Sequence, residues 1–224
     1  MDVTRRGFLT AAVAAALIPI AGRAQASPRP DGLVVSPAQA EAWLRDGNRR
    51  FAAGRPQRIN HAPDRPQAKG QWPFAGVLGC SDSRATPDDI FDVAPSNIFT
   101  VRNAGNVVDD EGLGSLEFAV RALGISTILV LGHTSCGAVQ AAQNYIRTGA
   151  LPGGHIDTIV EHIAPAVKPL PSAGTPDEGV IANVLQSKAL LMERSPVLAE
   201  AVAVGKVSLL GGVYRLATKQ VKFI

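Results

Sequence analysis

The chain has 224 residues, which is enough for one sizeable α/β domain with a complete hydrophobic core. Its composition, 46% hydrophobic and 18% charged, is that of an ordinary globular protein. The formal charge is only +3 and no basic stripe with interleaved aromatic residues occurs, so we do not expect nucleic acid as a partner. The presence of only two cysteines excludes a scaffold held together by several disulfides.

Residues 1–26 have the pattern of an export signal. Arg5 and Arg6 precede an apolar run that is too short to span a bilayer, and the Ala-x-Ala pattern ending at Ala26 suits signal peptidase. The paired arginines resemble a twin-arginine signal. This resemblance predicts a bacterial periplasmic or exported protein with no stable membrane anchor after cleavage. A general secretory signal and an uncleaved anchor are the alternatives.

Residues 27–72 are expected to form an N-terminal helical arm followed by an extended linker. Ser36 has the residue type of a helix N-cap, with proline at the first helical position and Gln39 at the third. Gly54 can end this helix. The residues after it are polar and rich in proline, which is typical of an extended connection.

Residues 73–224 are expected to form the main domain. Apolar runs typical of buried parallel strands occur at 74–79, 98–101 and 125–131. Helices are expected between and after them, at 111–123, 136–147 and 175–194, with a short successor starting at Ser195. Strands at 206–213 and 220–224 are expected to form a hairpin at the sheet edge. The alternation predicts an α/β fold with a central, mainly parallel sheet flanked by helices.

Three good zinc ligands follow two of these strands. Cys80 comes directly after the first apolar run, and His133 and Cys136 come after the third. Because ligands bind beyond the carboxyl ends of parallel strands, these side chains should meet at one edge of the sheet. Three protein ligands leave one position of a tetrahedral zinc open, which is typical of a catalytic site. A Cys80–Cys136 disulfide is the alternative in an oxidising compartment, but it leaves His133 without a role.

Two charged residues stand beside the first of these ligands. Asp82 is two residues from Cys80, close enough to reach a metal or its water. Arg84 is two residues further on, and its planar guanidinium can hold a carboxylate with two hydrogen bonds. The alternative is an exposed turn pair of little energetic value. The position of this pair next to a metal ligand favours a role in catalysis.

The Cys-x-Asp-x-Arg pattern at Cys80 and the His-x-x-Cys-Gly pattern at His133 together closely resemble the β-class carbonic anhydrases. Two further segments, 102–106 and 114–119, support the resemblance, which runs from about residue 47 to residue 140. It implies a β-carbonic anhydrase-like fold and one Zn²⁺ per subunit, held by residues of the 73–224 domain. It also implies reversible hydration of CO2 to bicarbonate and a proton by zinc-bound hydroxide, in a homodimer or higher multiple.

The same resemblance implies individual roles. Asp82 and Arg84 would act as a gate: held by Arg84, Asp82 orients the nucleophile, and released, it becomes a fourth zinc ligand. Substrate contacts are implied for Gln71, Phe99, Ala104 and Gly137. Phe118 stands where the plant-type branch has a tyrosine, so a hydroxyl contact is lost there. The alternatives are a solvated strand edge for Gln71 and core packing for the two phenylalanines.

The sequence also bears on pH dependence, the proton route and rival functions. Two thiolates cancel the formal charge of the zinc, so we expect a less acidic bound water and activity favoured at alkaline pH. The proton could leave through His61, His155 or His162, or through buffer and water. Hydrolysis of CS2 or COS on the same zinc site is the nearest rival reaction. A non-catalytic zinc- or bicarbonate-binding protein is the rival of another class.

Overall fold

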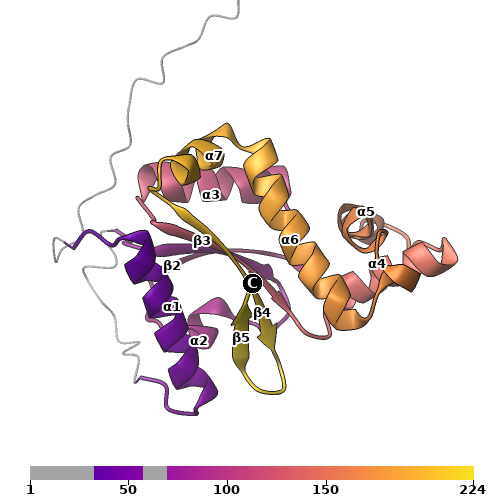
Figure 1. The fold of residues 1–224 in the computed structure, drawn as a ribbon, viewed down its shortest axis with the longest axis horizontal. Coiled ribbons are helices and arrows are strands. Elements are labelled where there is room, and N and C mark those ends of the chain that lie inside the picture. Colours follow the sequence, from indigo (N-terminus) through magenta and orange to yellow (C-terminus); the bar gives the residue numbers. More distant parts are fainter. Residues whose placement is uncertain (1–32, 58–69) are drawn as a thin grey trace, which may run out of the picture.

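The computed structural model describes residues 33–57 and 70–224. The signal predicted at residues 1–26 and most of the linker, including His61, lie outside the described residues. The sheet has five strands in the order β2-β1-β3-β4-β5, of which the first four run parallel and β5 antiparallel (Figure 1). The strands are β1 (Ala75–Cys80), β2 (Ile98–Asn103), β3 (Thr127–His133), β4 (Ser208–Arg215) and β5 (Gln220–Phe223).

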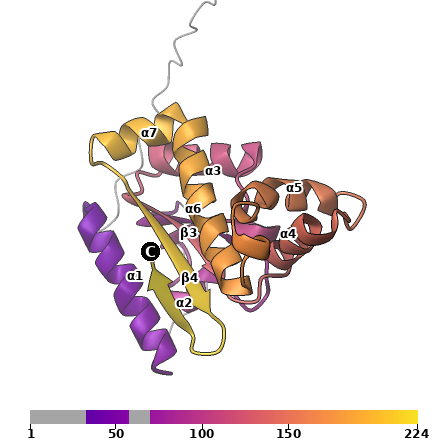
Figure 2. The same cartoon turned by 45° about the vertical axis from the view of Figure 1, so that its right-hand side comes forward.

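Helices cover both faces of this sheet, as the predicted fold class requires. They are α1 (Pro37–Ala52), α2 (Pro87–Ile90), α3 (Asp110–Ala122), α4 (Gly137–Thr148), α5 (Ile156–Val167), α6 (Pro176–Arg194) and α7 (Pro196–Ala203). One apolar cluster packs α1 and α2 against one face, and a larger cluster packs the remaining helices against the other. Helix α6 lies between the sheet and the α4–α5 pair (Figure 2).

The local signals in the sequence explain where several elements begin. Ser36 caps α1 by accepting a hydrogen bond from the Gln39 amide at 3.2 Å. Thr175 and Glu178 form a complete capping box at the start of α6, where a helix was predicted to begin. Strands β1 and β3 are buried along their whole length, which is why all of β1 and the interior of β3 consist of apolar and small residues.

One feature differs from the expectation: no helix was predicted for the α5 segment, because His155 provides no side-chain cap and Pro165 lies inside the helix. The C-terminal hairpin lies at the sheet edge, as predicted: β4 pairs in parallel with β3, and β5 forms the outermost strand. Among the described residues, no helix is long and apolar enough to cross a membrane.

Candidate metal centre

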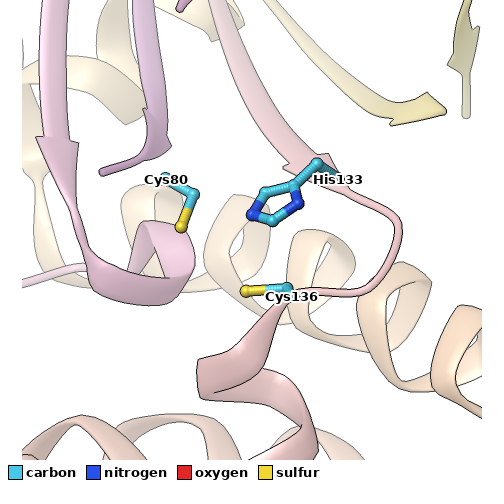
Figure 3. Close-up of side chains that lie close together, drawn as sticks. All are labelled: Cys80, His133 and Cys136. Atoms are coloured by element: carbon cyan, nitrogen blue, oxygen red, sulfur yellow. The ribbon is translucent and has the colours of Figure 1, made fainter. Parts of the chain in front are cut away.

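The ends of two neighbouring parallel strands bring the three predicted ligands together. Cys80 is the last residue of β1, His133 is the last residue of β3, and Cys136 is the N-cap of α4. Since β1 and β3 pair directly, their carboxyl ends lie side by side at one sheet edge. The two sulfur atoms and an imidazole nitrogen lie within 4.8 Å of one another, and all three side chains are buried (Figure 3).

The orientation of His133 suits a metal ligand. Its Nδ1 lies 2.9 Å from the carbonyl oxygen of Thr134, a contact that places the ring proton on Nδ1. Nε2 is buried and has no hydrogen-bond partner among the described residues. A buried nitrogen lone pair facing two sulfurs carries a free-energy cost unless something binds it. Both cysteines are free thiols in the structure, so they do not form the alternative Cys80–Cys136 disulfide.

The electrostatics of the sulfur pair also favour a cation. The hydrogen bond from the Cys136 thiol lowers the pKa of Cys80, and the same bond raises the pKa of Cys136. Burial opposes a charge on His133, but the nearby, negatively charged Cys80 sulfur outweighs this and raises the His133 pKa. The buried pair therefore disfavours two negative charges, and a divalent metal would allow both sulfurs to be thiolates.

Asp82 and Arg84 form the pair that the spacing predicted. The Arg84 guanidinium donates two hydrogen bonds to the Asp82 carboxylate, at 2.8 and 2.6 Å, and the Arg84 amide donates a third at 2.9 Å. These bonds hold the pKa of Asp82 well below its usual range. Asp82 Oδ2 nevertheless lies only 3.8 Å from His133 Nε2. The carboxylate therefore borders the metal position while Arg84 grips it.

Comparison with known proteins identifies the family. The profile of the family described as carbonic anhydrase matches residues 75–221. Carbonic anhydrase 2 of Mycobacterium tuberculosis is 42% identical over 185 residues, which cover 81% of this chain and 89% of the relative. The carbonic anhydrase of Mycolicibacterium smegmatis is 38% identical over 84% of this chain and 93% of its own length. The chain belongs to the β-class carbonic anhydrase family.

Solved structures of β-carbonic anhydrases have the same fold. The β-carbonic anhydrase CcaA superposes with a TM-score of 0.62 at 27% identity, over 70% of this chain and 76% of the other. The Coccomyxa β-carbonic anhydrase, solved with acetazolamide, has a TM-score of 0.58 at 30% identity, over 69% and 73% of the two chains. Zinc is the cofactor of this family, and the buried Cys-His-Cys set with its open ring nitrogen fits that metal.

The residues predicted to contact substrate divide into two groups in this carbonic anhydrase fold. Ala104 begins a short 3₁₀ turn, η2 (Ala104–Asn106), next to the metal site, and Gly137 is the first residue of α4, directly after Cys136. Gly137 is exposed, and a β-carbon added to it would meet no atom within 4 Å. Both residues therefore border the ligand cluster.

Gln71 and Phe99 lie at the other end of the sheet in the same chain. Phe99 is four residues before Asn103, the register partner of Cys80, so it is roughly 13 Å away along β2. Its ring packs against Phe118, with 6.3 Å between the ring centroids. Gln71 is exposed and precedes β1, in the segment that runs beside the loop before β2. One chain alone does not bring these two residues to its own metal site.

Other residues support the site through hydrogen bonds. Arg102 braces the strand ends, since it donates to the carbonyl oxygens of Cys80 and Asp82 at 2.8 and 2.7 Å. A backbone donor was missed: the Gly105 N–H points at Cys80 Sγ over 3.3 Å. The Arg-Asn-Ala-Gly-Asn motif was the signal that could have indicated it. His155 and His162 lie at the start and in the middle of α5.

Proposed function

We propose that this protein is an exported zinc carbonic anhydrase that converts CO2 and water reversibly into bicarbonate and a proton. The observation that carries the proposal is the buried set of two sulfurs and one free imidazole nitrogen, with an Arg-held carboxylate beside it. Zinc, when bound there, supplies a Lewis acid that makes water nucleophilic near neutral pH. The carbonic anhydrase relatives favour CO2 over CS2 or COS as the substrate.

The chain's own residues would hold and orient the reactants. The ionised Asp82 carboxylate would accept a hydrogen bond from the attacking water and so direct an oxygen lone pair toward the CO2 carbon. Arg84 would keep Asp82 away from the metal position, because its two donors occupy both carboxylate oxygens. The amide of Gly137, at the N-terminus of α4, would face the bicarbonate anion. If Arg84 released it, Asp82 would be close enough to bind the metal and close the site.

A second copy of the chain would complete the substrate pocket. Gln71 and Phe99 lie too far from the metal site of their own chain to contact its substrate, so these predicted contacts require a partner subunit. The Phe118 ring beside Phe99 is 52% exposed, which leaves an apolar surface for such a partner to cover. We therefore infer a homodimer or a higher multiple of it.

Export would follow from the twin-arginine signal at residues 1–26. The twin-arginine route carries folded proteins, which suits an enzyme that acquires its metal before it leaves the cytoplasm. Replacing both arginines, Arg5→Lys and Arg6→Lys, should abolish export and leave full-length protein inside the cell. Export of the double variant through a general secretory route would contradict this part of the proposal.

The function is tested by measuring zinc content and CO2 hydration on the same protein. We expect one zinc per subunit and rapid hydration, with both lost in Cys80→Ser and His133→Ala. CS2 and COS hydrolysis, assayed in parallel, should be weak. Protein that binds one zinc but does not hydrate CO2 would overturn the proposed reaction. Variants that keep both zinc and activity would overturn the ligand assignment.

A further inference from the structure

Helix α6 packs unusually close to the two segments that carry the metal ligands. Gly132 directly precedes His133, and a β-carbon at Gly132 would lie only 2.7 Å from a methyl group of Val184 on α6 and 3.0 Å from one of Val180. The helix also lies against α4, which begins at Cys136 (Figure 2). The part of α6 around Val180 and Val184 therefore lies next to the segment that carries His133.

Two polar side chains lie on this inner face one turn apart. Asn183 and Ser187 are each only 2% exposed, although both have polar groups. Asn183 Nδ2 donates to the carbonyl oxygen of Gly105 at 2.8 Å, and Ser187 Oγ donates to that of Asn106 at 3.1 Å. The helix thus holds two consecutive carbonyl groups of the η2 turn with two buried hydrogen bonds.

The turn that is held in this way has a demanding backbone conformation. Gly105 has φ +76° and Asn106 has φ +48°, two consecutive residues in the left-handed region. This conformation points the Gly105 N–H at Cys80 Sγ, at 3.3 Å. The Gly105 carbonyl belongs to the next peptide group, but together with the Ser187 bond to the Asn106 carbonyl it lets α6 hold the turn whose backbone angles direct the Gly105 N–H.

We propose that Asn183 and Ser187 are positioning residues that hold the Gly105 N–H against the Cys80 sulfur and thereby set the charge which that thiolate donates to the metal. A thiolate that accepts a hydrogen bond donates less charge, so the metal remains a stronger Lewis acid. Neither side chain is one of the three candidate metal ligands. The inference rests on the proposed zinc site and adds a control on its electronic character.

The test uses two variants and two measurements that do not depend on catalysis. Asn183→Leu removes the amide while keeping much of the volume, and Ser187→Ala is a milder change that should fold even if the first does not. In the cobalt(II)-substituted protein, both should shift the thiolate-to-cobalt charge-transfer band to longer wavelength, because an unbonded sulfur donates more readily. Competition with a chelator should show zinc binding weakened by roughly 10- to 100-fold in Asn183→Leu, because loss of the turn that orients the Cys80 sulfur outweighs the stronger donation.

Asn48→Ala is the matched control. Asn48 is also a buried asparagine that bonds backbone groups, at the Ile90 and Lys219 carbonyls and the Val221 amide, but it lies on α1 across the sheet. Asn48→Ala should lower the free energy of unfolding and leave the charge-transfer band of the cobalt protein unchanged. The proposal is overturned if the folded α6 variants keep the parental band and zinc affinity, or if Asn48→Ala shifts the band equally. If the unsubstituted protein binds metal but does not hydrate CO2, the proposed function is refuted. The band shift between this protein and its α6 variants would still test the roles of Asn183 and Ser187.

Discussion

The substitution Gly105→Ala should lower the free energy of unfolding for two reasons, a backbone cost and a steric cost. Gly105 has φ +76°, and an alanine in the left-handed region costs about 1–2 kcal/mol. Its β-carbon would also lie 2.6 Å from Ile163 Cδ1 and 3.0 Å from the β-carbon of Ala138. Ile163 is fully buried, so relieving this overlap adds about 1–3 kcal/mol. We therefore expect a total loss of roughly 2–5 kcal/mol in the free energy of unfolding.

Urea unfolding at a fixed, saturating zinc concentration measures this loss. Gly149→Ala is the control, because Gly149 has φ +73° but open space around its β-carbon position, so only the backbone cost applies. Ile163→Val alone should cost about 0.5–1.5 kcal/mol by removing Cδ1. Combined with Gly105→Ala, it should recover part of the steric loss, with an interaction energy of about 1 kcal/mol. Equal losses at Gly105 and Gly149, or strict additivity in the double variant, would refute this reasoning.

Three further predictions concern the carboxylate gate, pH and helix packing. Arg84→Ala should keep zinc bound but lower CO2 hydration by about 10- to 100-fold, since Asp82 loses the guanidinium that restrains it; unchanged hydration contradicts the gate. Arg84 lowers the Asp82 pKa, so this carboxylate loses its charge only when the pH falls through that low value. Asp82 therefore does not titrate where activity rises, and Asp82→Asn should lower activity without moving the main rise of the pH–rate profile. That rise should lie on the alkaline side, and stopped-flow hydration showing it well below about pH 7 would argue against a two-thiolate metal centre. Gly47→Ala should destabilise the protein by more than about 3 kcal/mol, because its β-carbon would lie 1.8 Å from the Phe91 carbonyl oxygen. Gly114→Ala, in open space on α3, is the control and should increase the free energy of unfolding by about 0.5–1 kcal/mol. Thermal or urea unfolding measures both.

Most of the fold and the metal ligands could be predicted from local sequence signals. Ser36 and Thr175 cap helices through side chains that act within three residues, so the sequence shows them directly. The apolar runs before Cys80 and His133 indicate buried parallel strands, and such strands end at a common edge. Helix α5 was not predicted because it lacks a side-chain cap and contains a proline; it packs mainly against α4 and α6, which no local pattern indicates.

By itself, the sequence determined the donor atoms of the metal centre, the Asp82–Arg84 pair and the family, because residue type and short spacing specify these features. Only the tertiary structure decided that Gln71 and Phe99 lie at the far end of the sheet from their own metal site, since strand register sets that distance. It also decided that Asn183 holds Gly105, 78 residues away in the chain. Contacts of this kind depend on how closely a helix packs on a sheet, and no local pattern of residues records that packing.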